Sequence, residues 1–566
     1  MTGAKIVVEC LLEQGVNLVF GYPGGTILNV YDALYDYRDR ITHIRTVHEQ
    51  GASHAADGYA RSTGRVGVCL ATSGPGSTNL VTGIATAYMD SSPVVFITCN
   101  VNENLIGKDS FQEVDITGIT MPITKCNYIV SHADQLADVM REAFAIARSG
   151  RPGPVLIDIL KNATAEEAEY EPLARSMHHT AGRLHSLIQR ASHDLRAPEP
   201  DNADIEKLVE MLSASKKPLL VCGGGVSRSR AHREFEEFAN RVDAPVAITV
   251  MGAGGFRGRN PLTTGMIGMH GSKASNMAVD NCDLLIAFGC RFSDRVALDP
   301  KSFASQAKIV HVDIDRSEIN KNVKTDHHII GDARRVLEML NELVPAYRHP
   351  EWKEYVFSFP TETEYPLTGD ALNPRQITDV IARVCPQDTI VSTDVGQHQM
   401  WAIQHFHYDY PGQLITSGGF GSMGFGLGAA IGAKASHPDK CVLHITGDGS
   451  FRMNCQELAT VAAYKLPVIT ILFDNRTLGM VRQWQTLIYN QRYCETDMPD
   501  VVDYVKLAEA YGLSGKRVHS VAGFEKALQE ALACGHGYVI DCVIDMDEKV
   551  RPMVSGGDPI TKFIID

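Results

Sequence analysis

Apolar runs of strand length alternate with stretches of helical periodicity along most of the chain. An extended segment at residues 41–46 precedes a helix of small residues at 50–60, and a further apolar run follows at 154–159. Later apolar runs lie at 218–222, 245–250, 283–288, 308–314, 441–446 and 468–473. Strands that alternate with helices in this way predict parallel, doubly wound sheets. We therefore expect an α/β protein.

Composition divides the chain into three such blocks joined by two linkers. Residues 163–202 turn acidic, then basic, and hold no sustained apolar period, while residues 346–370 are interrupted by prolines. The expected domains are residues 1–162, residues 203–345, and residues 371–566 with a C-terminal tail. The first and third blocks look alike in pattern, which fits a duplicated fold. A chain of 566 residues is long enough for three or four domains.

The most specific motif lies in the third block, where polar side chains follow two apolar runs. Gly-Asp-Gly-Ser at 447–450 follows the first run, and Asn475 follows the second, with a helix expected at 454–465 between them. Flanking glycines let the backbone approach a diphosphate, and Asp448, the amide oxygen of Asn475 and the backbone carbonyl of Thr477 could hold Mg²⁺. An ordinary strand-end turn is the alternative, and the spacing to Asn475 disfavours it.

A second candidate site lies at Glu49, between the extended segment 41–46 and the helix of small residues. A carboxyl group can transfer protons near neutral pH when burial raises its pKa. The alternative is an exposed glutamate in the first turn of a helix, stabilised by the helix dipole. The presence of the motif around Asp448 in the same chain favours the catalytic interpretation.

Charge and cysteine usage limit the partners and the compartment. The formal net charge of −14 disfavours nucleic acid as a partner. No run approaches 18 apolar residues, so no membrane span is expected. The N-terminus enters a helical pattern at once, so no secretory or transit segment is expected. The 13 cysteines form no CxxC pair, which is typical of reduced thiols in a cytoplasmic protein.

The motif around Asp448 resembles the diphosphate-binding motif of thiamin diphosphate (ThDP) enzymes, with Asp474 as the first residue of the usual Asn-Asn pair. Over essentially its whole length the chain resembles the large catalytic subunit of acetohydroxyacid synthase, also called acetolactate synthase. The matching segments are 20–25, 72–76, 111–113, 151–155, 268–271, 291–296, 394–399, 421–426 and 480–485. The resemblance implies a pyrimidine-binding N-terminal domain, a Rossmann-like FAD-binding central domain and a diphosphate-binding C-terminal domain.

The resemblance also assigns residues to cofactors. In this family the glutamate at position 49 pairs with N1′ of the aminopyrimidine, and Met423 bends the cofactor. The implied ThDP residues are Pro23, Gly24, Glu49, Val395, Gly396, Gln397, His398, Gly421, Ser422, Met423, Gly447, Asp448, Gly449, Ser450, Asn475, Thr477, Gly479 and Met480. Those implied for a flavin without a net redox role are Arg151, Gly223, Gly224, Gly268, Met269, His270, Gly289, Arg291, Arg295, Asp313 and Asp332.

Substrate residues follow from the same resemblance. Arg295 resembles the arginine that binds the carboxylate of the second 2-oxo acid, for which a planar fork is suited. Trp484 resembles the residue that selects 2-oxobutanoate, and Met480 lies one helical turn away. The alternatives are a surface ion pair and helix packing. The catalytic set implied by the resemblance is Gly25, Glu49, Phe111, Gln112, Lys161, Arg295, Met480 and Trp484.

The function implied is a transferase reaction of branched-chain amino acid biosynthesis. Pyruvate is decarboxylated, and the two-carbon unit is ligated to pyruvate or 2-oxobutanoate. Family members bind ThDP, Mg²⁺ and FAD and place active sites between subunits, so we expect a homodimer or homotetramer. A small regulatory subunit is also an expected partner.

Departures from the family pattern leave alternatives open. The loop 100–108, which lines the substrate channel in relatives, is unusually polar here, and Leu160 and Gly428 replace family prolines. Another ThDP-dependent carboligase, lyase, decarboxylase or pyruvate oxidase acting on a different 2-oxo acid is therefore an alternative. Trp484 together with Arg295 favours ligation over oxidation. A non-enzymatic flavoprotein is disfavoured because Glu49, Asp448 and Asn475 are all in place.

Overall fold

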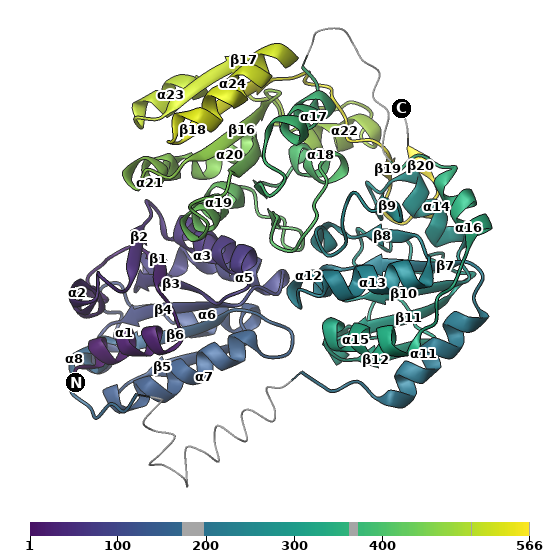
Figure 1. The fold of residues 1–566 in the computed structure, drawn as a ribbon. Coiled ribbons are helices and arrows are strands. Elements are labelled where there is room, and N and C mark those ends of the chain that lie inside the picture. Colours follow the sequence, from purple (N-terminus) through teal and green to yellow (C-terminus); the bar gives the residue numbers. More distant parts are fainter. Residues whose placement is uncertain (173–196, 362–371, 500, 565–566) are drawn as a thin grey trace.

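Three six-stranded parallel sheets, each flanked by helices, make up the molecule (Figure 1). The computed structural model describes residues 1–172, 197–361, 372–499 and 501–564, so most of the first expected linker lies outside these ranges. In Figure 1 the first block (purple to blue) lies below the third (green to yellow), with the central block (teal) beside both. The expected α/β class with doubly wound parallel sheets is confirmed.

The first block has the strand order β2-β1-β3-β4-β6-β5. Its strands are β1 (Leu18–Gly21), β2 (Thr42–Arg45), β3 (Gly67–Thr72), β4 (Val94–Asn100), β5 (Cys126–Val130) and β6 (Val155–Leu160). Its helices are α1 (Gly3–Glu13), α2 (Leu28–Asp36), α3 (Glu49–Thr63), α4 (Pro75–Thr78), α5 (Val81–Met89), α6 (Ile116–Thr120), α7 (Leu136–Arg148) and α8 (Lys161–Ala165). Strands β3, β4 and β6 are buried throughout, as expected where helices cover both faces of a parallel sheet.

The third block repeats this order as β14-β13-β15-β16-β18-β17, which agrees with a duplicated fold. Its strands are β13 (Ile390–Thr393), β14 (Leu414–Thr416), β15 (Val442–Gly447), β16 (Val468–Asp474), β17 (Ser514–Val518) and β18 (Tyr538–Val543). Its helices are α17 (Pro374–Val384), α18 (Gln397–His405), α19 (Phe425–Ser436), α20 (Asp448–Asn454), α21 (Leu458–Ala463), α22 (Gly479–Leu487), α23 (Tyr504–Ala510) and α24 (Val521–Cys534).

The expected helix at 454–465 differs from the observed elements. Helix α20 already begins at Asp448, and a 3-10 turn, η6 (Cys455–Glu457), separates it from α21. Gly447 is the extended N-cap of α20, and Asp448 occupies its first turn, where a carboxylate is favoured by the helix dipole. The Gly-Asp-Gly motif is therefore the start of a helix and not a separate turn.

The central block has the order β12-β11-β10-β7-β8-β9. Its strands are β7 (Pro218–Cys222), β8 (Val246–Ile248), β9 (Thr263–Met266), β10 (Leu284–Phe288), β11 (Lys308–Asp313) and β12 (His327–Ile330). Its helices are α11 (Asn202–Ala214), α12 (Gly224–Arg228), α13 (His232–Val242), α14 (Lys273–Asn281) and α15 (Ala333–Leu343).

Two segments outside the expected central domain also pack on its core. Residues 346–370, expected to be a linker, contain helix α16 (Pro350–Phe357), whose Trp352 and Val356 are buried in the central core. Pro350 occupies the first turn of α16, a position that tolerates proline, so the residue starts a helix here. The C-terminal tail forms the antiparallel pair β19 (Met553–Val554) and β20 (Phe563–Ile564), and Met553 joins the same core.

The first and third blocks meet through helices α3 and α19, which lie side by side in Figure 1. Glycines let the two backbones touch. A Cβ at Gly58 would lie 2.2 Å from the Ala429 carbonyl oxygen, and one at Gly432 would lie 1.9 Å from that of Ala55. Side chains at these positions would force the helices apart, so the relative placement of the two blocks depends on glycine at both.

Candidate active site

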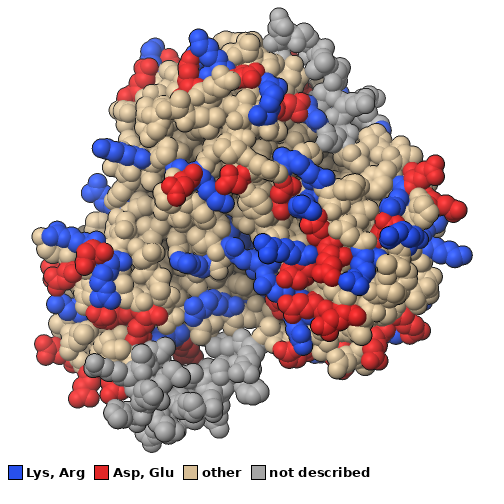
Figure 2. All heavy atoms as spheres, in the orientation of Figure 1, with Lys and Arg blue, Asp and Glu red and all other residues tan. Residues whose placement is uncertain are grey.

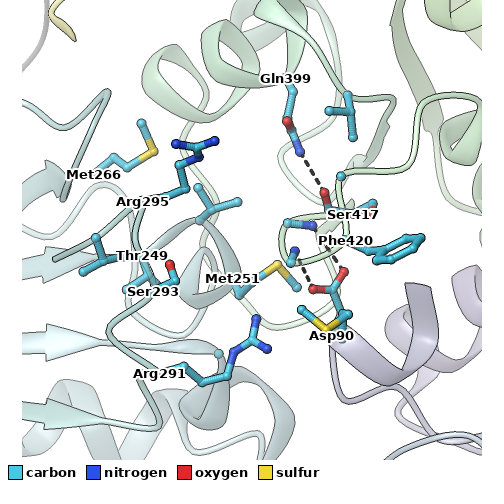
Figure 3. A pocket seen from close by; sticks show the side chains of 18 of the residues that line it. Asp90, Thr249, Met251, Met266, Arg291, Ser293, Arg295, Gln399, Ser417 and Phe420 are labelled. Carbon is cyan, nitrogen blue, oxygen red and sulfur yellow. Dashed lines mark hydrogen bonds between the residues drawn. The ribbon is translucent and has the colours of Figure 1, made fainter. Parts of the chain in front are cut away.

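A cavity of about 1090 Å³ lies where the three blocks meet (Figure 3). Its walls come from the carboxyl ends of central-block strands, from loops after β13, β15 and β16 of the third block, and from the end of α5 in the first block. Loops at the carboxyl ends of parallel strands are where open α/β sheets bind ligands. This volume slightly exceeds the usual range for ligand pockets, about 300–1,000 Å³, which leaves room for more than one cofactor.

Asp448 provides a buried anionic oxygen in this cavity. Its Oδ1 accepts a hydrogen bond from Gly449 N at 3.0 Å, whereas Oδ2 has no hydrogen-bond partner among the described residues. Burial, and then the neighbouring Asp474 carboxylate, raise the pKa of Asp448. A divalent cation would satisfy the orphaned oxygen and remove the cost of burying its charge, so the donor set fits a hard metal ion.

Asn475 and Thr477, the other expected metal ligands, line the same cavity. Asn475 Nδ2 donates to Gln397 Oε1 at 3.3 Å, so this amide group is oriented with its oxygen away from Gln397. Gln397 Nε2 in turn donates to Gln483 Oε1 at 3.0 Å and to the Glu548 carbonyl at 2.8 Å. The structure therefore brings all three expected metal ligands to one wall of the cavity, and Gln397 orients the side chain of Asn475.

His398 lies beside this metal-ligand wall. It is buried, its Nε2 has no hydrogen-bond partner among the described residues, and burial lowers its pKa to about 4. The ring is therefore neutral at pH 7. Ser450 donates to the Val395 carbonyl at 2.8 Å, which ties the loop after β13 to the start of α20. These two loops form the surface expected for the diphosphate.

The loop 417–424, which precedes α19, carries Gly421, Ser422 and Met423. Asp90, the residue that ends α5, holds this loop across the domain boundary. Its Oδ1 accepts from Gly419 N at 2.7 Å, and its Oδ2 accepts from Gly418 N at 3.2 Å (Asp90 is labelled in Figure 3). Oδ2 also accepts from Arg61 Nη1 at 3.0 Å. Sequence reasoning did not single out Asp90.

Gly421 and Met423 line the cavity, but Ser422 does not. The Ser422 hydroxyl lies 2.7 Å from that of Thr86 and is buried, so it contributes to the contact between the first and third blocks. Gly424 follows with φ = +81° as the N-cap of α19, a conformation that glycine adopts without strain.

Most residues expected to contact flavin line the opposite wall: Arg151, Gly224, Met269, His270, Gly289, Arg291, Arg295, Asp313 and Asp332. Gly223 and Gly268 do not line it but are required for close packing behind it. A Cβ at Gly223 would lie 2.2 Å from the Gly289 carbonyl oxygen, and one at Gly268 would lie 2.1 Å from that of Arg295. Asp332 also caps α15 by accepting from Arg334 N at 2.9 Å.

The expected acceptor residues also reach the cavity. The Arg295 side chain is 64% exposed, and its ion pair with Asp294 spans 3.6 Å, so its guanidinium is available to an incoming carboxylate. Met480 and Trp484 both lie on α22 and both line the cavity. Met480 packs against the core of the third block and Trp484 against that of the central block, so α22 bridges the two.

Arg151 is the one expected residue of the first block that lines this cavity, and the expected ThDP and substrate residues of that block lie elsewhere: Pro23, Gly24, Gly25, Glu49, Phe111, Gln112 and Lys161 do not line it. Glu49 is buried at the start of α3, and its Oε2 accepts from Asn79 Nδ2 at 2.9 Å. Phe111 is 86% exposed. Within one chain, the two groups of expected ThDP residues are thus separate.

Comparison with known proteins identifies the family. Family models for thiamine pyrophosphate enzymes match residues 1–119 (N-terminal TPP binding domain), 205–340 (central domain) and 394–542 (C-terminal TPP binding domain). A probable acetolactate synthase large subunit of Methanocaldococcus jannaschii is 44% identical over 100% of this chain and 95% of its own length. The chain belongs to the acetolactate synthase large-subunit family of thiamine pyrophosphate enzymes.

Other members of the family are similarly close. The acetolactate synthase isozyme 2 large subunit of Escherichia coli is 43% identical over 98% of each chain, and the large subunit of Haemophilus influenzae is 40% identical over 100% of this chain. Thiamine pyrophosphate is another name for ThDP. The resemblance inferred from the motifs is therefore confirmed, and the chain is an enzyme with ThDP-binding domains at both ends.

Figure 2 shows basic and acidic side chains intermingled over the face in view. No helix within the described ranges is both long enough and apolar enough to span a bilayer.

Proposed function

We propose that this protein is an acetolactate synthase, which decarboxylates pyruvate and ligates the resulting two-carbon unit to a second 2-oxo acid. Full-length similarity to acetolactate synthase large subunits carries the proposal. The cavity supports it, because the buried Asp448 oxygen and the exposed Arg295 guanidinium line one space. An anion-binding acceptor site beside a cofactor site is what a ligase of two 2-oxo acids needs.

The residues fit ThDP, Mg²⁺ and FAD as cofactors. Asp448, Asn475 and Thr477 would hold Mg²⁺, and the loops after β13 and β15 would hold the diphosphate next to the neutral His398. The central-block wall would hold FAD. Bound ThDP supplies an electron sink for decarboxylation.

Glu49 is proposed to exchange a proton with N1′ of the aminopyrimidine. Its carboxyl group is buried, and Asn79 fixes its direction. A carboxyl group that transfers a proton to a cofactor must be held within hydrogen-bond reach of the accepting atom. Burial and the contact with Asn79 therefore suit Glu49 to proton exchange. Arg295 would bind the carboxylate of the acceptor, and Trp484 would cover its alkyl group and exclude water.

We further propose that a second copy of the chain completes each active site. Glu49 and the cavity residues do not meet within one chain, and the exposed Phe111 lies on the same block as Glu49. A homodimer or homotetramer with active sites between subunits would unite them. A regulatory subunit and a cytoplasmic location belong to the same proposal, as does a role in branched-chain amino acid biosynthesis.

Product analysis tests the function. Purified protein with ThDP, Mg²⁺ and FAD should convert pyruvate to acetolactate, and pyruvate with 2-oxobutanoate to 2-aceto-2-hydroxybutanoate, as identified by mass spectrometry and NMR. Acetate with peroxide would instead indicate an oxidase. Glu49→Gln should still bind ThDP but lose about 100-fold or more in turnover, as expected for loss of a general acid–base group. Wild-type turnover in this variant would overturn the role of Glu49.

A further inference from the structure

A buried carboxylate of the third block reaches the start of helix α3, which carries Glu49. Glu457, the last residue of η6, is fully buried. Its carboxylate oxygens accept hydrogen bonds from Val47 N at 3.2 Å and from His48 N at 3.0 Å. These two residues directly precede Glu49, although more than 400 positions separate them from Glu457 in the sequence.

The carboxylate is satisfied by hydrogen bonds rather than by a cation. Thr460 Oγ1 donates to Glu457 Oε2 at 2.6 Å, and within the described part of the chain no lysine, arginine or histidine forms an ion pair with Glu457. Burial raises the pKa of Glu457, and these hydrogen bonds offset only part of that rise. Replacing a buried carboxyl group by an apolar residue costs little stability if the group only fills space. The same replacement is costly if it leaves buried backbone N–H groups without an acceptor, as it would for Val47 and His48.

The surrounding residues leave space for this contact. A Cβ at Gly51 would lie 2.2 Å from Glu457 Oε1, so glycine at 51 is needed for the carboxylate to reach the helix start. A second contact holds the same loop, because Arg45 N donates to Tyr464 Oη at 2.8 Å. The peptide between β2 and α3 is therefore docked on the third block through its main chain.

We propose that Glu457 is a positioning residue for Glu49: by accepting hydrogen bonds from Val47 N and His48 N, it fixes the first turn of α3 and so the direction of the Glu49 carboxyl group. The proposal rests on the proposed role of Glu49. Asn79 orients the Glu49 side chain from one side, and Glu457 holds the backbone behind it. Loss of either contact would leave Glu49 present but misdirected.

Glu457→Gln tests the proposal. The amide keeps the size of the side chain but offers one acceptor oxygen instead of two, and its NH₂ group faces a peptide N–H. We expect the holoenzyme variant to lose about 10–100-fold in kcat, the range for a misplacement of about 1 Å at a catalytic group. KM for pyruvate should change less than kcat. Deuterium exchange at C2 of bound ThDP, followed by NMR, should slow by the same factor as kcat.

Amide hydrogen exchange supplies a readout that does not depend on activity. In Glu457→Gln, peptides that cover residues 44–52 should exchange faster than in the wild type, with and without ThDP. Thr460→Val is the matched control, because it removes the hydroxyl donor but leaves both peptide contacts. Tyr464→Phe removes the neighbouring hydrogen bond to Arg45 N. This variant should change amide exchange in residues 44–52 more than it changes deuterium exchange at C2 of ThDP.

The possible outcomes distinguish a role of Glu457 in positioning Glu49 from a role in holding the first and third blocks together. Wild-type C2 exchange and kcat in Glu457→Gln would overturn the proposal, even if residues 44–52 exchanged faster. A loss of kcat with unchanged C2 exchange would also overturn it. If the amide variant does not fold, Glu457→Asp keeps the charge but withdraws the oxygens, and wild-type C2 exchange in that variant would refute positioning.

The variant Glu49→Gln shows whether a negative result refutes only the positioning role of Glu457 or the proposed role of Glu49 itself. If Glu49→Gln is inactive while Glu457→Gln behaves like the wild type, only positioning by Glu457 is wrong. If Glu49→Gln itself retains wild-type C2 exchange, the role of Glu49 is wrong and positioning falls with it.

Discussion

Asp90→Asn should weaken cofactor binding without touching a cofactor residue. The Asp90 carboxylate accepts three hydrogen bonds, from Gly418 N, Gly419 N and Arg61 Nη1. Asparagine preserves the shape, but its one carbonyl oxygen cannot replace both carboxylate oxygens, and its NH₂ group must face a donor. The loop that carries Met423 therefore loses at least one of its two attachments to the first block.

The magnitude follows from the number and kind of bonds lost. A hydrogen bond to a charged group contributes about 1.5–3 kcal/mol, so the substitution should cost about 2–4 kcal/mol. Part of this cost falls on the buried Arg61, which keeps its two bonds to Asp57 at 2.8 and 2.6 Å. If about half of this cost, about 1–2 kcal/mol, falls on the loop, the fraction of protein with a binding-competent loop drops, and the apparent Kd for ThDP rises about 5–30-fold.

Fluorescence titration with ThDP at saturating Mg²⁺ measures this Kd. Asp57→Asn is the matched control, because it removes the other carboxylate of Arg61 but none of the contacts to Gly418 and Gly419. Both variants should lose thermal stability. The apparent Kd for ThDP should rise more in Asp90→Asn than in Asp57→Asn. Equal values of Kd in the two variants would refute the reasoning, since the effect would then come from Arg61 and not from the loop.

Three further predictions concern the acceptor, the metal and pH. Trp484→Leu should reduce the preference for 2-oxobutanoate over pyruvate by about 10-fold or more in a competition assay, and an unchanged product ratio would show that Trp484 serves packing alone. A chelator should abolish ThDP binding, and Asp448→Asn should require about 10-fold or more Mg²⁺ to restore it in the same titration. Burial lowers the pKa of His54 from 6.5 to about 4, so the unfolded state binds its proton first and stability is lost as pH falls from 6.5 toward 4. His54→Leu should flatten the fall of Tm over this range, and an equally steep fall would contradict the assignment.

Local sequence signals were sufficient for the parts of the site that lie on strand ends. The apolar runs before Asp448 and Asn475 predicted two neighbouring strands, and parallel strands place their carboxyl ends at one edge. Asp90 and Glu457 could not be found in this way. Their partners are backbone amides, which carry no residue signature, and Asp90 lies 328 positions from Gly418. Helix α16 was missed for a different reason, since Pro350 was interpreted as a break.

The duplicated fold explains why these two carboxylates matter. Helices α3 and α19 follow equivalent strands, β2 and β14, and pack against each other across the domain boundary. The loop before each helix carries proposed active-site residues, and each loop is held by a carboxylate of the opposite block: Glu457 binds the peptide before Glu49, and Asp90 binds the peptide before Met423.

Each half of the proposed site is therefore ordered by a domain that does not contain it. Glycines at 58 and 432 set the distance between α3 and α19. The hydrogen bonds of both carboxylates cross the same boundary between the first and third blocks. A change that separates the helices should disturb both loops at once, whereas loss of one carboxylate should disturb one loop only. Because the blocks are coupled in this way, a substitution far from any cofactor can impair the proposed proton transfer at Glu49 and the placement of the Met423 loop together.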